Sequence, residues 1–295
     1  MAHSNKIKIA LSGLPENDWW GSGISAYKDN DMMADGVIPN QELVCSEHNN
    51  LRNTIESLGI ETLSIPFTKE LEETEKFDFI FMRDHFLCNT AKKIVMCNMR
   101  LEERFNEGKF VVDKLKQLGY TISYLPDQDC LAEGGEFFYL PKENVLLAGI
   151  SRNNLKGAES TAELMDVKEL HLLPSGGYHL DTAICPIFNK DYDCIGINCA
   201  KEVFNDKNYA TLRDLCSKNS WELIDIENYN QKKSLEARAA MNALTLPGIL
   251  ISGAPILSKK VEDFTSANNI LMHISSVSQF NLSGGSVHCL TNELF

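Results

Sequence analysis

The chain has 295 residues, of which 43% are hydrophobic and 23% are charged, and its formal net charge is −13 at pH 7. This composition is typical of a globular protein with a sizeable core, and the excess of acidic residues argues against nucleic acid and anionic membranes as partners. The same charge favours a small cationic ligand.

The beginning of the chain shows no pattern for export or membrane insertion. Its first apolar run, Ile9 to Leu11, is far shorter than a signal-peptide core or a membrane-spanning helix. The nine cysteines are scattered and form no CxxC pair, which argues against a zinc ribbon and a disulfide framework. Cys185 and Cys194 lie in apolar stretches and are expected to be buried thiols. We therefore expect a cytoplasmic protein.

The stretch LPENDWWGSGISAYKDND (14–31) combines glycines, acidic residues and two adjacent tryptophans. On one interpretation it is a loop whose aromatic side chains pack on the core. On the other it is a lid that closes over a substrate, as long loops often do. The sequence leaves both interpretations open.

A unit that recurs along the rest of the chain predicts a modular α/β fold. In each copy a polar or helix-like stretch leads into a short strand of alternating or continuous apolar residues. The period of roughly 50 to 60 residues favours stacked modules or a propeller-like ring, within a single domain over 1–295. A helix is expected over 99–119, ending at Gly119. The five strand-bearing units are 57–66, 117–126, 166–175, 218–226 and 267–276.

Polar residues follow the expected strands at matching places. If the modules form a ring, equivalent points on each module converge at its centre and form a site. Glycine pairs stand beside three of these groups and allow close approach of the backbone or a positive φ. In chain order the groups are Asp84 at the end of a strand in FDFIFMRDHFL, Glu133 in AEGGEFF, His179 and Asp181 in SGGYHLDTAIC, Asn242 at the start of a strand in MNALTLPGILIS, and Cys289 in SGGSVHCL.

These residue types suit nucleophilic attack on a guanidinium carbon. Cys289 is a strong nucleophile when it is a thiolate, His179 can act as general acid and base, and Glu133 can orient the imidazole. Asp84 and Asp181 can clamp a guanidinium, whose forked N–H donors match carboxylates. The positive charge of such a substrate would also lower the pKa of the thiol.

Four motifs resemble those of the guanidine-modifying enzymes of the pentein superfamily, which include arginine deiminases, dimethylargininases, agmatine deiminases and amidinotransferases. They are FMRD (81–84), EGGE (133–136), HLDT (179–182) and GGSVHCLT (284–291), in the order of that superfamily. The resemblance implies an α/β fold in the form of a five-bladed, pseudo-symmetric propeller of ββαβ-type modules.

The resemblance also implies an activity. A hydrolase of this kind cleaves a C–N bond of a linear amidine through a covalent thiouronium intermediate, here on Cys289. His179 then acts as acid and base, Glu133 pairs with the histidine and the substrate, and Asp84 and Asp181 hold the guanidinium.

The chain departs from the superfamily pattern at several points. Glu136 replaces a more common aspartate, and the element whose arginine binds a substrate carboxylate appears only as GISRNN (149–154), which makes Arg152 the candidate ligand. The length is that of a dimethylargininase, whereas Asp181 in HLDT is typical of the deiminases. Because a second aspartate needs free N–H groups, we favour an unmethylated guanidine.

The expected reaction is the release of ammonia from arginine or a close relative to give a ureido product. The alternatives are a dimethylargininase-like release of an alkylamine, a citrulline-type ureido hydrolase and, in a different class, a non-catalytic pentein binding module. Asn242 is a further candidate substrate ligand. His288 and Cys289 are expected in a strand, where adjacent side chains point to opposite faces, so His288 is expected to point away from the site as a structural residue. His85, His171 and His273 show no metal-ligand spacing, so neither metal nor cofactor is expected, and a homo-oligomer is compatible with the sequence.

Overall fold

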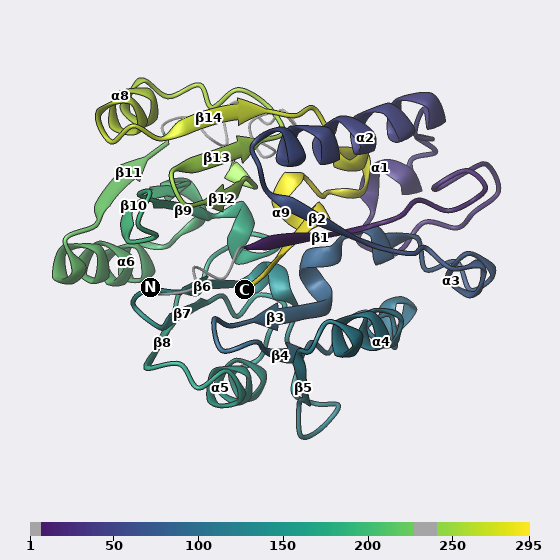
Figure 1. The fold of residues 1–295 in the computed structure, drawn as a ribbon, viewed down its shortest axis with the longest axis horizontal. Helices are drawn as coiled ribbons and strands as arrows, with labels where there is room; N and C mark the ends of the chain where they lie inside the picture. The colour runs from purple at the N-terminus through teal and green to yellow at the C-terminus, as the bar shows by residue number, and fades with distance from the viewer. Residues whose placement is uncertain (1–6, 227–240) are drawn as a thin grey trace.

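The described strands form five small sheets arranged as a ring (Figure 1). The computed structural model describes residues 7–226 and 241–295. Each sheet has three strands, and its middle strand pairs antiparallel with one neighbour and parallel with the other. Helices α2, α4, α5, α6 and α8 lie around the outside of Figure 1, and the short helix α9 lies near its middle. This arrangement confirms the predicted α/β propeller of five modules.

The elements have the following bounds. The strands are β1 Lys8–Ser12, β2 Glu61–Ile65, β3 Phe86–Cys88, β4 Lys93–Met96, β5 Thr121–Tyr124, β6 Phe137–Leu140, β7 Val145–Ala148, β8 Glu169–Leu172, β9 Ile184–Phe188, β10 Cys194–Cys199, β11 Glu222–Asp225, β12 Leu244–Leu246, β13 Ile249–Ser252, β14 Leu271–Ile274 and β15 Thr291–Leu294. The α-helices are α1 Asp31–Ala34, α2 Gln41–Ser57, α3 Lys69–Glu73, α4 Lys109–Gln117, α5 Leu155–Leu164, α6 Asp206–Asn219, α8 Lys259–Ala267 and α9 Val287–Leu290. The 3₁₀-helices are η1 Phe77–Ile80, η2 Met82–His85, η3 Glu102–Arg104, η4 Gly134–Glu136, η5 Leu180–Thr182, η6 Lys201–Val203 and η7 Phe280–Ser283.

The chain repeats one connection around the ring. The modules β3-β4-α4-β5, β6-β7-α5-β8, β9-β10-α6-β11 and β12-β13-α8-β14 all have the predicted ββαβ order. The remaining module combines β1, α2 and β2 with the C-terminal strand β15, which pairs antiparallel with β1 at Leu11 and Thr291. The pairing of β15 with β1 closes the ring and fixes the C-terminal end of the chain. All five predicted strand units contain the third strand of a module, so the repeat is confirmed.

Asparagine side chains begin several of the outer helices. Asn40, Asn154 and Asn205 each accept a hydrogen bond from the backbone N–H three residues further on, which caps α2, α5 and α6. Each helix then packs one apolar face against its sheet. The buried positions on these faces include Val44, Leu51 and Ile55 of α2, Val111 and Leu115 of α4, Ala158 and Ala162 of α5, and Leu212 and Leu215 of α6.

Two predicted elements are wrong in detail. The apolar run that leads to Asp84 was expected to be a strand, but it forms two consecutive 3₁₀-helices, η1 and η2. The prediction failed because the sequence pattern of such a short buried run does not distinguish helix from strand. The helix expected over 99–119 is confined to α4, Lys109–Gln117. Asn106 has a left-handed φ of 66°, which a continuous right-handed helix does not contain.

The functional side chains predicted from the sequence lie at equivalent points of the modules. All but Arg152 stand at the turn that precedes the first strand of the ββ pair or, in the closing module, precedes β15. Arg152 lies between β7 and α5. Neighbouring turns contact one another, since η2 contacts η4 and α9, and η4 contacts η5. The ring thus collects side chains that are far apart in the sequence.

Close packing of these turns requires glycine. A Cβ on Gly134 would lie 1.9 Å from the backbone oxygen of Arg83, so we expect Gly134→Ala to destabilise the protein by about 2–4 kcal/mol in urea unfolding. Gly108→Ala is the matched control, because its Cβ would meet the flexible end of Met96 at 3.0 Å and the backbone oxygen of His85 at an ordinary contact distance of 3.9 Å. We expect it to cost less than about 1 kcal/mol. Equal losses in both variants would contradict this account of the packing.

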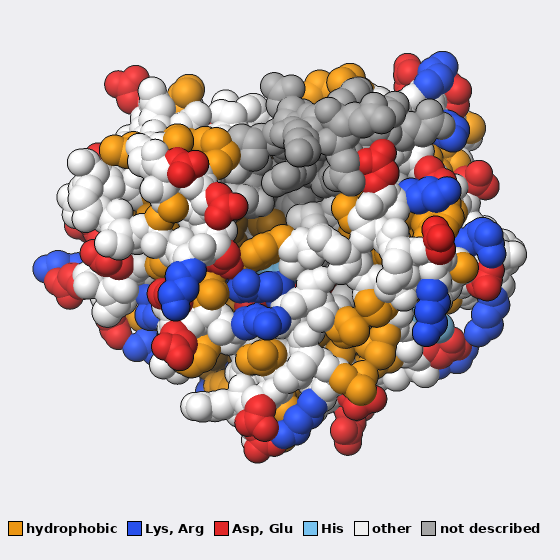
Figure 2. Space-filling view, turned by 180° about the vertical axis from the view of Figure 1, so that it is seen from behind, with side chains coloured by type: hydrophobic (Ala, Val, Ile, Leu, Met, Phe, Trp, Pro, Cys, Tyr) orange, Lys and Arg blue, Asp and Glu red, His pale blue; other side chains and the backbone are white. Residues whose placement is uncertain are grey.

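The surface carries both signs of charge. Figure 2 shows acidic and basic side chains interspersed over the face opposite that of Figure 1. Among the described residues, no helix is both long enough and apolar enough to span a membrane.

Candidate active site

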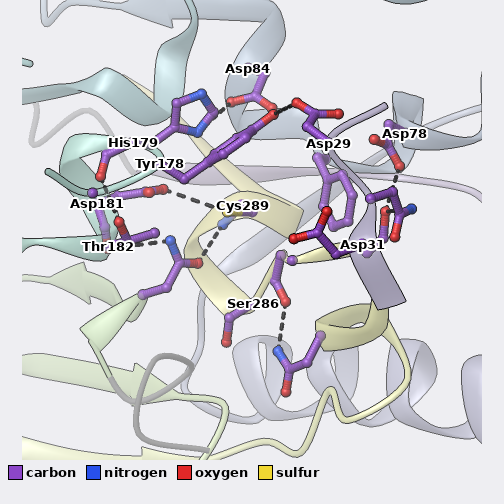
Figure 3. A pocket seen from close by; sticks show the side chains of 18 of the residues that line it. Asp29, Asp31, Asp78, Asp84, Tyr178, His179, Asp181, Thr182, Ser286 and Cys289 are labelled. Atoms are coloured by element: carbon purple, nitrogen blue, oxygen red, sulfur yellow. Dashed lines mark hydrogen bonds and ion pairs between the residues drawn. The ribbon is translucent and has the colours of Figure 1, made fainter. Parts of the chain in front are cut away.

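A cavity of about 380 Å³ opens where the turns of the modules meet. Figure 3 shows side chains of η2, η5 and α9 pointing into it. The structure brings five of the predicted site residues to its wall: Asp84, His179, Asp181, Asn242 and Cys289. The other two predicted residues, Glu133 and Arg152, do not line it.

Cys289 lies on α9, one turn before β15, and not in a strand as the sequence suggested. The Asn242 side chain accepts a hydrogen bond from the Cys289 N–H at 3.0 Å, and the Asn242 carbonyl accepts one from the His288 N–H at 3.2 Å. The Cys289 Sγ donates to Asp181 Oδ2 at 3.6 Å (Figure 3). Burial and the carboxylates Asp181 and Asp84 raise the pKa of the Cys289 thiol well above its ordinary value. Without a ligand, Cys289 is therefore a neutral thiol.

The approach of α9 to the cavity depends on the preceding glycines. Gly284 has a left-handed φ of 83°, and a Cβ on Gly285 would lie 2.1 Å from the ring of Phe81. The turn predicted from the glycine pair is therefore confirmed. It directs Cys289 into the ring.

His179 and Glu133 form a buried ion pair beside the cavity. His179 Nε2 lies 2.7 Å from Glu133 Oε2, and His179 Nδ1 lies 3.8 Å from Asp84 Oδ1. Burial opposes the charged imidazole, but Asp84 and Glu133 together raise the pKa of His179 to about 9. Burial likewise opposes ionisation of Glu133, yet His179 and Arg152 lower its pKa. His179 is therefore a cation at neutral pH in the unliganded site.

Asp84 is held by groups from two other turns. Its Oδ2 accepts a hydrogen bond from Arg104 Nη1 at 2.8 Å, and its Oδ1 accepts one from the Gly135 N–H at 3.2 Å. Asp84 pairs with Arg104 rather than with its neighbour Arg83, which forms an ion pair with Glu293 at 2.5 Å.

Arg152 stands apart from the cavity wall. Its Nε and Nη2 donate to Glu133 at 2.9 and 3.2 Å, and its Nη1 donates to Asp29 at 3.0 Å. The guanidinium also stacks on the ring of Tyr178, with its central carbon 4.5 Å from the ring centroid. Arg152 therefore does not line the cavity, and three of its five N–H groups donate to Glu133 and Asp29. Its role as a ligand of a substrate carboxylate stays a prediction.

The 14–31 segment shares features of both interpretations. Trp19 and Trp20 are buried and donate to the Phe77 carbonyl and to Asp78, as expected of aromatic side chains packed on the core. The end of the segment reaches the cavity, where Asp29 accepts a hydrogen bond from the Tyr178 hydroxyl at 2.5 Å.

A family model of the eukaryotic N,N-dimethylarginine dimethylhydrolases matches residues 28–295. The chain belongs to this family. It is thus a hydrolase of C–N bonds in amidines, of the pentein superfamily, as its motifs predict. No curated protein sequence matches the chain significantly.

Solved structures of this family's fold resemble the chain over nearly its whole length. The N-terminal domain of ArgZ, an arginine dihydrolase from the ornithine–ammonia cycle in cyanobacteria, has a TM-score of 0.79 at 20% identity, and the match covers 99% of this chain and 98% of that chain. DDAH from Pseudomonas aeruginosa, complexed with citrulline, has a TM-score of 0.72 at 14% identity, covering 97% and 98%. AgrE, in a binary complex with L-arginine, matches at 18% identity and a TM-score of 0.78. This match covers 98% of this chain and 40% of the AgrE chain. At these identities the likeness establishes a common fold.

The sequence interpretation missed Arg104 and gave His288 only a structural role. Arg104 lines the cavity and also binds Glu107, but it lies in the stretch 99–119 that the pattern assigned to one helix. His288 does not line the cavity, but its Nδ1 lies 2.8 Å from Asp181 Oδ2, whereas a strand at this position would have turned it away.

The His179 ion pair makes stability depend on pH. Because the pKa of His179 is raised to about 9 from 6.5, its contribution is fully present below pH 6.5 and is lost as the pH rises through 9. We expect the wild type to lose on the order of 3 kcal/mol relative to His179→Asn over this interval in urea unfolding. Parallel stability curves for the two proteins would contradict the assignment of a charged His179.

Proposed function

We propose that this hydrolase attacks the guanidino carbon of arginine or a close relative with Cys289 and releases ammonia and a ureido product. The observation that carries the proposal is the arrangement of Asp84, Asp181 and Cys289 on the wall of one cavity. Two carboxylates at a nucleophile suit a flat cation with several N–H donors. A neutral amide substrate suits them less, because it brings no positive charge to the two carboxylates and offers fewer N–H donors.

The reaction divides into two halves on the same residues. A guanidinium between Asp84 and Asp181 lowers the pKa of the Cys289 thiol, which both carboxylates raise when the site is unliganded. The thiol then releases its proton to bulk water as the substrate binds, because His179 is already protonated. The thiolate then forms a C–S bond with the guanidino carbon, and one C–N bond breaks as His179 donates its proton to the departing ammonia.

Water completes the cycle. Neutral His179 accepts a proton from a water molecule that adds to the same carbon, and cleavage of the C–S bond regenerates Cys289 and leaves the ureido product. Glu133, 2.7 Å from His179 Nε2, supports the imidazolium in each half. In this scheme Asn242 holds the backbone of Cys289 from the cavity wall, and its contact with the substrate stays a prediction.

An unmethylated guanidine fits the carboxylates best. Asp181 is fully buried, and its Oδ1 has no hydrogen-bond partner in the structure. A buried acceptor of this kind is costly unless a ligand supplies a donor. The N–H groups of arginine supply such donors, whereas dimethylation removes them from one nitrogen.

Release of dimethylamine from N,N-dimethylarginine is the second candidate. It is favoured by the match of residues 28–295 to the eukaryotic dimethylargininase family model. In this case Asp181 would face the unsubstituted nitrogen, and the cavity would hold the two methyl groups elsewhere.

A substrate panel decides between the candidates. The protein is incubated with arginine, N,N-dimethylarginine, agmatine and citrulline, and the products are followed by mass spectrometry. We expect arginine to yield citrulline and ammonia with the highest kcat/KM. A preference for dimethylarginine supports the second candidate, consumption of citrulline supports a ureido hydrolase, and no turnover of any compound supports a non-catalytic binding protein.

A further inference from the structure

His288 directly precedes the proposed nucleophile, and its side chain is directed toward the cavity wall. Its Nδ1 lies 2.8 Å from Asp181 Oδ2, and the residue is 2% exposed. Since an ionised carboxylate only accepts hydrogen bonds, Nδ1 of His288 carries the proton and donates it. His288 therefore contacts Asp181, the residue proposed to bind the substrate, and does not itself line the cavity.

The two oxygens of Asp181 have different surroundings. Oδ2 accepts from both His288 Nδ1 and Cys289 Sγ, whereas Oδ1 has no partner. Figure 3 shows the Asp181 side chain extending from η5 toward Cys289. With Oδ2 held by the protein, the rotamer of Asp181 is set, and Oδ1 is the oxygen that lacks a donor.

His288 is itself held in place from two sides. Its ring stacks on Phe138 with a centroid separation of 4.9 Å, and its carbonyl accepts from Arg83 Nε at 3.4 Å. Burial and the Arg83 charge lower the pKa of His288, which leaves a neutral imidazole beside Asp181. The pKa of Asp181 is lowered although burial opposes its ionisation, because His288 donates to it.

We propose that His288 is a positioning residue that orients Asp181 and keeps it ionised, so that Oδ1 receives an N–H of an unmethylated guanidinium. This role rests on the proposed function at the same site. The charged and titratable groups around the pair come from several elements. They are Arg83, Asp84, Glu136, His179, Cys185, Cys289 and Glu293.

Three substitutions at this position separate positioning from packing. His288→Phe keeps a ring against Phe138 but removes the donor, and His288→Gln places its amide near the position of Nε2 instead of Nδ1. His288→Asn retains a donor at the position of Nδ1. If the Phe variant does not fold, as judged by circular dichroism, the Gln variant takes its place.

We expect the Phe and Gln variants to lose about tenfold in kcat/KM for arginine, and the Asn variant to stay within about threefold of the wild type. Without the donor the pKa of Asp181 rises, so the acidic limb of the pH–rate profile should move up by about one pH unit. A residue with only a packing role would lower the rate without moving this limb. Equal losses in all three variants, with an unchanged limb, would overturn the proposal.

A second measurement is independent of turnover. The carboxyl signal of Asp181 in protein labelled with ¹³C-aspartate, assigned with Asp181→Asn, is titrated by NMR in the wild type and the variants. We expect a higher Asp181 pKa in the Phe or Gln variant and a value near that of the wild type in the Asn variant. The same pKa in all of them overturns the role of His288, whereas a wild type that turns over no guanidino compound refutes the proposed function alone.

Discussion

Cys289→Ser is expected to lower turnover of the guanidino substrate by on the order of 10³-fold or more. The hydroxyl of serine is a far weaker nucleophile than a thiolate, and the guanidinium cannot lower its pKa into a useful range. The substitution removes little volume, and the backbone hydrogen bond from residue 289 to Asn242 does not depend on the side chain. Binding of substrate should therefore survive, as measured by calorimetry on the variant.

Cys45→Ser is the matched control for this experiment. Cys45 is exposed on α2, so its loss should leave kcat and KM unchanged. Full activity in Cys289→Ser, or an equal loss in both variants, would remove Cys289 from the reaction.

His179→Asn is expected to lower kcat by about 10²–10⁴-fold, because it removes the proton donor for the leaving amine and the base for water. The His179 side chain lies on the cavity wall and bonds to Glu133. The loss should be smaller for a substrate whose leaving group needs no proton. Stopped-flow measurements with such a substrate would separate the two roles of the histidine.

His171→Asn provides the control for general effects of removing a histidine. His171 lies on β8, the outer strand of its sheet, 3.3 Å from Glu169, and it does not line the cavity. We expect it to retain wild-type kinetics. A His179→Asn variant that also retains them would show that another group transfers the proton.

The fold could be predicted because the repeated strands carry local signals. Gly59 and Gly119 both have a left-handed φ just before a strand, and each marks the end of a helix in the sequence. The turns that carry Asp84 and Cys289 carry no such signal. In these turns a few buried apolar residues form the 3₁₀-helix η2 and the short α-helix α9. Their conformation depends on packing against neighbouring turns, which a local sequence pattern does not reveal.

The site could be predicted in part for the same reason. Cys289, His179 and Asp181 occupy equivalent turns of the ring, so their convergence follows from the repeat. Arg104 lies outside these turns and reaches Asp84 from η3. His288 shares the turn of Cys289, but it reaches Asp181 because α9 is helical where a strand was expected.

The most direct test of the central claim is the detection of a covalent intermediate on Cys289. The wild type is mixed with arginine labelled with ¹³C at the guanidino carbon, quenched in acid during turnover and digested for peptide mass spectrometry. The account predicts a labelled thiouronium adduct on the peptide that contains Cys289, which rises and decays as ammonia and citrulline accumulate. Labelled product that forms with no adduct on Cys289, at any quench time and also in the slower His179→Asn variant, would contradict it.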